Sequence, residues 1–168
     1  MQNIGIFFGS ATGSTETAAN LIKKEFSADS VKCFDVSDAK ASDIEACTNL
    51  IFGSSTWIIG ELQDDFEGFV SEIKSANLEG KKVAIFGLGD QYSYPDSFAD
   101  AIGLIYDILQ DKGCEIIGET SIEGYEHGES RAERDGQFVG LVLDQDNQSE
   151  LSDTRIKSWV DQLKKHFD

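Results

Sequence analysis

The feature that most constrains this chain is an apolar run followed at once by glycine and hydroxyl-bearing residues, at positions 4–17. Residues 4–8 predict a buried β-strand, and the polar residues after them predict a loop that opens a helix. The start of a helix has unpaired N–H groups and a partial positive charge, and Gly13 lets the backbone approach an anion closely. The loop also carries the hydroxyl groups of Ser10, Thr12, Ser14 and Thr15. This pattern predicts a cradle for a phosphate group, with a Ser/Thr-capped turn between strand and helix as the alternative.

The residues missing from this loop exclude two common nucleotide-binding motifs. A P-loop NTPase needs a Lys followed by Ser or Thr after its second Gly, and no Lys or Arg occurs between positions 1 and 22. The three-glycine spacing of a Rossmann dinucleotide site is absent too. The loop can therefore bind a terminal phosphomonoester only through neutral donors.

The composition indicates one acidic domain. A chain of 168 residues is long enough for one well-buried core and short for two. Its 14 Lys and Arg against 31 Asp and Glu give a net charge of −17, which disfavours binding to nucleic acid or to an anionic membrane. The same charge favours a partner with a basic face, although solubility alone is the simpler explanation.

The sequence gives no sign of a membrane anchor, a metal site or a disulfide. No apolar segment approaches the roughly 20 residues of a membrane span, and the chain opens on a strand pattern without a signal peptide, so we expect a soluble, cytoplasmic protein. Cys33, Cys47 and Cys114 stand apart and are interpreted as small buried hydrophobic residues. His127 and His166 are isolated as well, so we expect no metal site and no catalytic triad.

Strand and helix patterns alternate along the chain. Apolar strand patterns occur at residues 4–8, 31–36, 50–55, 82–88 and 114–117. Helical spacing occurs at residues 18–26, 42–47, 64–74 and 98–113, and in a C-terminal helix capped near Ser152 or Asp153. Because parallel strands need crossover connections, the alternation predicts an α/β fold with a doubly wound, five-stranded parallel sheet and helices on both faces. The loops at Ser10, Thr56 and Gly89 all follow strands, so we expect them at the one sheet edge where such folds bind ligands.

The fifth strand pattern is interrupted. Residues 119–138 form an irregular, glycine-containing and acidic region after the short strand at 114–117. Residues 138–143 then restore an apolar strand pattern, and Asp135-Gly136 predicts a tight turn before it. We therefore expect one domain in which a loop insertion splits the fifth strand.

Five segments, in order, carry a resemblance to a known family. They are residues 10–15, Thr56-Trp57 with residues 60–62, residues 89–91 with Tyr94, residues 134–141, and residues 144–149. Together they are similar to flavodoxins over essentially the whole chain, and specifically to the long-chain form, whose fifth strand is split by an inserted loop. The resemblance implies the strand order 2-1-3-4-5, a single domain over residues 1–168, and flavin mononucleotide (FMN) as the cofactor.

The resemblance also implies which residues surround FMN. They are Ser10, Ala11, Thr12, Gly13, Ser14 and Thr15 at the phosphate, Ser55, Thr56, Trp57, Ile58, Ile59 and Gly60 in the first ring loop, Leu88, Gly89, Asp90, Tyr94 and Ser97 in the second, and Asp146 near the ribityl chain. Trp57 and Tyr94 lie in strand-end loops, where a planar flavin can stack between large aromatic rings. Trp57 could instead plug the edge of the sheet, and Ser97 could instead cap the helix that follows.

The function implied by the resemblance is electron transport without substrate turnover. In flavodoxins, FMN works between the neutral semiquinone and the anionic hydroquinone, and the flavin supplies the chemistry. No Lys or Arg occurs at 56–73 or 83–111, whereas acids are frequent there, so we expect a low potential. The implied partners of this monomer are redox proteins with basic faces, such as a ferredoxin/flavodoxin-NADP reductase, photosystem I or nitrogenase reductase.

Two other classes of protein remain open. An FMN-dependent NAD(P)H or quinone oxidoreductase shares this fold but needs an open face for its substrate. A phospho-receiver module needs paired acids after the first strand, where Gly9 and Ser10 stand in this chain.

Ile58 departs from the Gly or Asn that members of the family carry in the turn after Trp57. In the family, the peptide between the residues matching Ile58 and Ile59 can flip when the flavin gains a proton, which can demand a positive φ. A β-branched residue adopts positive φ at a cost of about 1–3 kcal/mol. We hypothesise that the two one-electron potentials lie closer together here than in an Ile58→Gly variant, unless Gly60 supplies the positive φ instead.

Overall fold

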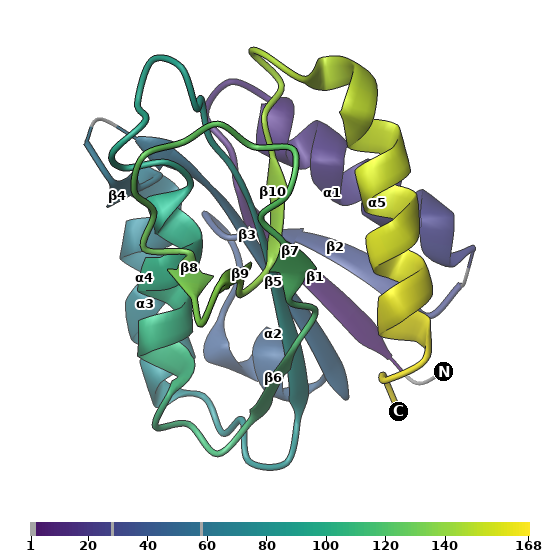
Figure 1. Cartoon of the computed structure of the whole chain (residues 1–168). Coiled ribbons are helices and arrows are strands. Elements are labelled where there is room, and N and C mark those ends of the chain that lie inside the picture. Colours follow the sequence, from purple (N-terminus) through teal and green to yellow (C-terminus); the bar gives the residue numbers. More distant parts are fainter. Residues whose placement is uncertain (1–2, 28, 58) are drawn as a thin grey trace.

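A parallel β-sheet with helices packed on both of its faces forms the centre of the molecule (Figure 1). The computed structural model describes residues 3–27, 29–57 and 59–168. The main strands are parallel and lie in the order β10, β5, β3, β1, β2. Their bounds are β1 Ile4–Gly9, β2 Val31–Asp35, β3 Asn49–Trp57, β5 Lys82–Leu88 and β10 Leu141–Leu143. The predicted doubly wound α/β fold is confirmed.

Each face of the sheet has its own apolar core. Along β1, Ile4, Ile6 and Phe8 belong to one buried cluster, and Phe7 belongs to the other, because successive side chains of a strand point to opposite faces. Helices α1 (Ser14–Phe26) and α5 (Ser149–Lys164) pack into the first cluster. The second cluster holds α2 (Ala41–Glu45), α3 (Asp64–Ser75) and α4 (Asp100–Leu109). Burial on both faces explains why the central strands read as continuous apolar runs.

The position beside β5 is filled by two separate segments. Strand β6 (Glu115–Ile117) pairs with residues 82–84 of β5, and β10 pairs with residues 86–88 of the same strand. Residues 118–140, here called the insertion, leave the main sheet between them. This is the arrangement that the sequence predicts for an interrupted fifth strand.

The insertion contains a small antiparallel sheet of its own. Its strands lie in the order β7 (Thr120–Ser121), β9 (Gln137–Phe138), β8 (Glu133–Arg134). Asp135 (φ 54°) and Gly136 (φ 81°) form the tight turn between β8 and β9, which confirms the predicted turn. The expectation of one strand over 138–143 is wrong, because Phe138 belongs to the small sheet and β10 to the main one. Gly140 lies at the break, where any side chain would collide with the Ile85 carbonyl oxygen.

Three other boundaries differ from the prediction. The segment predicted as a loop after Thr56 is a hairpin, because β3 runs on to Trp57 and pairs antiparallel with β4 (Glu61–Leu62). Helix α5 begins before the predicted cap, since the Ser152 hydroxyl donates to the Gln145 side chain instead. Helix α4 begins at Asp100, after Ala99 with a φ of 52°.

The structure also bears on the membrane, metal, cysteine and histidine expectations. No helix within the described ranges is long and apolar enough to cross a membrane, and no acid, His or Cys group there could hold a metal ion. Burial raises the pKa of the thiols of Cys33, Cys47 and Cys114, which fits their interpretation as small hydrophobic residues. His127, in the insertion, packs against the rings of Phe98 and Phe138 and pairs with Glu133.

Candidate functional site

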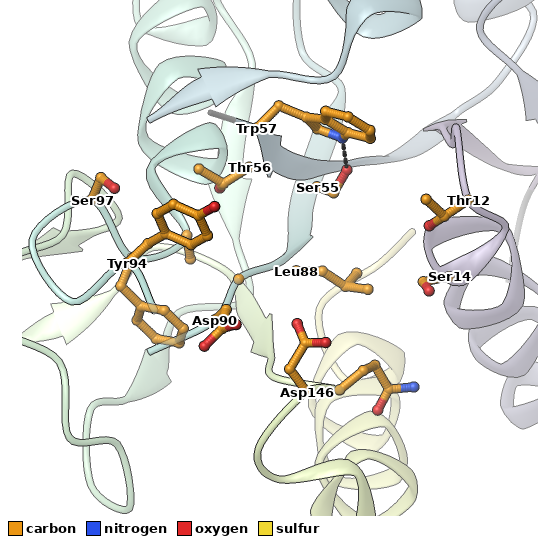
Figure 2. A pocket seen from close by; sticks show the side chains of 14 residues that line it. Thr12, Ser14, Ser55, Thr56, Trp57, Leu88, Asp90, Tyr94, Ser97 and Asp146 are labelled. Carbon is orange, nitrogen blue, oxygen red and sulfur yellow. Dashed lines mark hydrogen bonds between the residues drawn. The ribbon is translucent and has the colours of Figure 1, made fainter. Parts of the chain in front are cut away.

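A cavity of about 290 Å³ opens at the carboxyl-terminal edge of the sheet, between the loops that follow β1, β3, β5 and β10 (Figure 2). This edge includes the point between β1 and β3 where the strand order reverses, and folds of this class bind ligands there. The lining residues are Thr12, Ser14, Ser55, Thr56, Trp57, Leu88, Gly89, Asp90, Tyr94, Ser97, Phe98, Ala99, Gln145 and Asp146. We call this space the cofactor cavity.

One end of the cofactor cavity is the start of α1. Thr12 and Ser14 lie together on this side in Figure 2. Helix α1 has Gly13 (φ 92°) as its N-cap and no side-chain cap, so N–H groups of its first turn have no partner within the helix. A side chain at Gly13 would meet no atom within 4 Å, so an anion has room to approach. The described residues that line the cavity include no Lys or Arg, so an anion here would be held by neutral donors and the helix dipole.

The other end of the cofactor cavity carries two exposed aromatic rings. Trp57, at the end of β3, is 38% exposed, and Tyr94, in the loop after β5, is 49% exposed. The Trp57 indole N–H donates to the Ser55 hydroxyl oxygen at 2.7 Å, which fixes the ring over the cavity. Large rings are normally buried, so this exposure points to a flat ligand between them.

Three carboxylates lie beside the cavity, and none of them forms an ion pair with another described residue. Asp90 and Asp146 line it. Asp144 is fully buried behind them and accepts hydrogen bonds from the Gln91 amide groups and from Asn147. The Asn147 side chain also donates to Asp90 at 2.8 Å and so joins the two acids. Asp90 and Asp144 are thus held in place by neutral amide groups.

The pKa values of the two lining acids, Asp90 and Asp146, are shifted in opposite directions. Burial, and then repulsion from Asp90 and Asp144, raises the pKa of Asp146. Burial also acts to raise the pKa of Asp90, but hydrogen bonds from Ser93, Asn147 and Tyr92 hold it below its usual range. Asp90 is therefore a fixed negative charge at neutral pH.

The structure brings most of the predicted FMN residues together. Those that line the cofactor cavity are Thr12, Ser14, Ser55, Thr56, Trp57, Leu88, Gly89, Asp90, Tyr94, Ser97 and Asp146. Those outside its lining are Ser10, Ala11, Gly13, Thr15, Ile59 and Gly60. Ile58 lies outside the described residues.

Most of the residues outside the lining have other contacts or positions in the structure. The Ser10 hydroxyl oxygen accepts the Gly13 N–H at 3.0 Å, which shapes the loop. Thr15 is buried in the first turn of α1, and Ile59 is 78% exposed. Gly60, with φ 78°, packs against Asp100. The positive φ that we considered for the turn after Trp57 is present at Gly60.

The sequence reasoning missed Phe98, Ala99 and Gln145. Ala99 lines the cavity because its backbone adopts a positive φ of 52°, for which an alanine gives no signal. Gln145 could have been found, since it precedes Asp146. Ser97 does not cap α4 with its side chain: its carbonyl accepts the Asp100 N–H at 3.3 Å.

Comparisons with known proteins agree with this geometry. The sequence model of the family described as Flavodoxin matches residues 6–159. Flavodoxins of Nostoc sp. and Synechococcus elongatus are 49% and 48% identical to this chain, over 99% of it and 98% and 99% of their own lengths. The chain belongs to the flavodoxin family. Its length fits the long-chain form of the family.

The fold comparison gives the same result for the structure. The solved flavodoxin of Fusobacterium nucleatum, bound to flavin mononucleotide, matches with a TM-score of 0.95 and 33% identity, over the whole of both chains. Flavodoxins are electron-transfer flavoproteins rather than enzymes with substrate turnover of their own. The family therefore excludes the phospho-receiver alternative.

Proposed function

We propose that residues 1–168 form a single domain that binds one FMN in the cofactor cavity and serves as a low-potential, one-electron carrier between the neutral semiquinone and the anionic hydroquinone. The observation that supports this most is the cavity itself, which joins an uncapped, cation-free helix start to two exposed aromatic rings. The solved flavodoxin of Fusobacterium nucleatum is bound to FMN, which supports FMN as the cofactor proposed here.

The residues present fit the chemistry of FMN. The first-turn N–H groups of α1 and the hydroxyls of Thr12 and Ser14 would hold the phosphate. Trp57 and Tyr94 would hold the ring between them. FMN supplies one-electron redox chemistry when bound, and the protein binds it, orients it and sets its electrostatic surroundings.

The acids around the cavity should make the potential of the second reduction step of FMN more negative. Asp90 and Asp146 line the cavity and Asp144 lies buried behind them, whereas no Lys or Arg lines it. A second electron adds negative charge in this field, and like charges at short range disfavour it. We therefore propose that the second reduction step occurs at an unusually negative potential.

The partner is proposed to be a redox protein with a basic face, such as a ferredoxin/flavodoxin-NADP reductase, photosystem I or nitrogenase reductase. We propose that the protein acts as a monomer in the cytoplasm. The net charge of −17 supports steering over a Debye length, about 8 Å at physiological salt. Association should slow as salt rises, and a rate that is flat from low salt upward would contradict simple steering.

Ligand binding to the apoprotein tests the cofactor proposal. FMN should bind far more tightly than riboflavin, because riboflavin lacks the phosphate that the α1 loop would hold. Equal affinities would contradict the phosphate assignment. Steady-state assays with NADH and a quinone separate the carrier from an oxidoreductase of the same fold, since a carrier gives no sustained turnover.

A further inference from the structure

The segment that follows β10 brings two polar side chains of different kinds to the cofactor cavity. Gln145 and Asp146 are neighbours in the sequence, and both line the cavity. An ionised carboxylate such as that of Asp146 only accepts hydrogen bonds, whereas the side-chain amide of Gln145 has N–H donors as well as an acceptor oxygen. The proposed function uses the charge of Asp146 and leaves Gln145 without a role.

A hydrogen-bonded turn holds both residues in place. The Gln148 N–H donates to the Asp144 carbonyl oxygen at 2.8 Å, and the Asn147 N–H donates to the Asp144 side chain at 3.1 Å. Asp144 itself is fully buried. Gln145 and Asp146 are therefore the central residues of a turn whose base is fixed. Their side chains line the cavity without any rearrangement of the main chain.

The amide of Gln145 is oriented by helix α5. Ser152, in the first turn of α5, is only 3% exposed, and its hydroxyl donates a hydrogen bond to the Gln145 side-chain oxygen. This bond occupies the acceptor side of the amide and leaves its Nε2 group as a donor. No other described residue accepts a hydrogen bond from Nε2. These N–H groups are therefore available to a ligand in the cavity.

The charges around Gln145 decide which part of a flavin it can contact. Repulsion from Asp90 and Asp144 helps to raise the pKa of Asp146, so these carboxylates lie close together. They would repel a phosphate, but a hydroxyl group can donate to a carboxylate while its oxygen accepts from the amide. In Figure 2, Asp146 lies between Asp90 at the ring end and Ser14 at the phosphate end. A hydroxyl-bearing chain that joins ring and phosphate suits this place.

We propose that Gln145 is a specificity-determining residue for the cofactor, because its Nε2 group donates to a hydroxyl oxygen of the ribityl chain of FMN. The inference rests on the proposed function. Ser152 is then a positioning residue, which acts by holding the amide of Gln145 in the orientation of a donor. Together with Asp146, the amide offers both a donor and an acceptor to a chain whose hydroxyl groups need both.

The experiment compares two ligands that share the ring and the phosphate. One is FMN, and the other is phosphopentyl flavin, in which a phosphorylated pentyl chain without hydroxyl groups replaces the ribityl chain. Each ligand is titrated into the apoprotein of the wild type and of Gln145→Leu, which removes the amide at similar size and adds no charge. The change in flavin fluorescence gives the dissociation constants.

The two ligands should respond differently to Gln145→Leu. The dissociation constant for FMN should rise about three- to tenfold, because one hydrogen bond is lost, and that for phosphopentyl flavin should stay within about twofold. Equal losses for the two ligands would place the amide at the phosphate or the ring and overturn the proposal. An unchanged constant for FMN would overturn it as well.

Gln110→Leu is the matched control. Gln110 is exposed at the C-terminal end of α4 and does not line the cavity. The same change of side chain there should leave both dissociation constants unchanged. If it weakens FMN binding as much as Gln145→Leu does, the effect is not local and the proposal is wrong.

A double-mutant cycle tests the role of Ser152. Ser152→Ala should weaken FMN binding by a smaller factor than Gln145→Leu, because the amide keeps its donor and loses only the bond that orients it. In the Gln145→Leu background, Ser152→Ala should have no further effect on FMN binding. Independent losses would overturn the proposal. If Gln145→Leu alone folds poorly, comparing the double variant with Ser152→Ala measures the effect of Gln145 without an unpaired Ser152 hydroxyl.

Failure of the proposed function would give a different result. If the wild type binds neither FMN nor phosphopentyl flavin, the proposed function is wrong. If the wild type binds FMN and Gln145→Leu binds it equally well, the proposal for Gln145 is wrong and the proposed function stands.

Discussion

The two ends of the cofactor cavity are built in different ways. At the phosphate end, residues 11–13 are exposed, and the loop is shaped by few bonds, among them that from Gly13 to Ser10. At the ring end, Asp90 accepts bonds from Tyr92, Ser93 and Asn147. The Pro95 carbonyl oxygen there accepts two more from the insertion.

The difference shows what each end contributes. The phosphate end keeps its donors unpaired, so a bound anion supplies most of the hydrogen bonds that the loop lacks. The ring end is held in place by the protein itself, through Asp144 on one side and the insertion on the other. Substitutions at the ring end should therefore reduce the stability of the protein, and substitutions at the phosphate end should reduce only the affinity for the ligand.

The largest effect is expected from Asp144→Ala. This change leaves the buried Gln91 donors and the half-buried Asn147 backbone N–H without an acceptor, which should lower the free energy of unfolding by about 3 kcal/mol. Urea unfolding measures it. Asp144→Asn keeps one acceptor oxygen and should lose less. An alanine variant as stable as the wild type would show that the ring end is not held through Asp144.

Thr12→Val tests the phosphate end. The residue is exposed at the rim, so the stability of the apoprotein should stay within about 0.5 kcal/mol of the wild type. The affinity for FMN should fall about five- to tenfold, because one hydrogen bond to a charged group is lost. Riboflavin is the control ligand: its affinity should not change. A matching loss with riboflavin would place Thr12 away from the phosphate.

Asp100→Asn tests a smaller, pH-dependent effect at the ring end. Burial raises the pKa of the Asp100 carboxyl, and the backbone N–H and the charge of Arg131 only partly lower it again. The folded protein therefore binds this proton at a higher pH than the unfolded chain. Stability from this group therefore increases as pH falls from neutral through the raised pKa. Asp100→Asn should lose that increase and differ from the wild type by under about 1 kcal/mol at neutral pH. Urea unfolding of both holoproteins at a series of pH values measures it, and identical pH profiles would contradict it.

The smallest effect is expected from Ile58→Gly. Gly60 already has the positive φ of this turn, so the variant should separate the two one-electron potentials only slightly. A potentiometric comparison with the wild type measures the separation. If the two potentials are unchanged or closer together in the variant, the hypothesis that Ile58 strains this turn is wrong.

The sequence predicted the parts of the site that follow strands. Trp57 ends an apolar run that forms a parallel strand, and Thr12, Asp90 and Tyr94 lie in the loops that follow two others. Parallel strands end at one edge of the sheet. Their meeting around one cavity therefore followed from the order of the elements.

The remaining parts depend on tertiary contacts that leave little local signal. Ala99 adopts a left-handed conformation although nothing in its residue type requires it. The apolar run at residues 138–143 is typical of one strand. Its first residue, however, pairs in the small sheet and residues 141–143 pair in the main sheet, and Gly140 between them passes close to Ile85. The backbone hydrogen bonds between the insertion and residues Pro95 and Phe98 likewise join segments far apart in the sequence.

A potentiometric titration of the purified holoprotein tests the central claim most directly. The account predicts one FMN per chain, reduced in two resolved one-electron steps, with the second step at a more negative potential than the same step of free FMN. A protein that binds no flavin, or one that takes both electrons in a single step and passes them from NADH to a quinone in steady state, would contradict it.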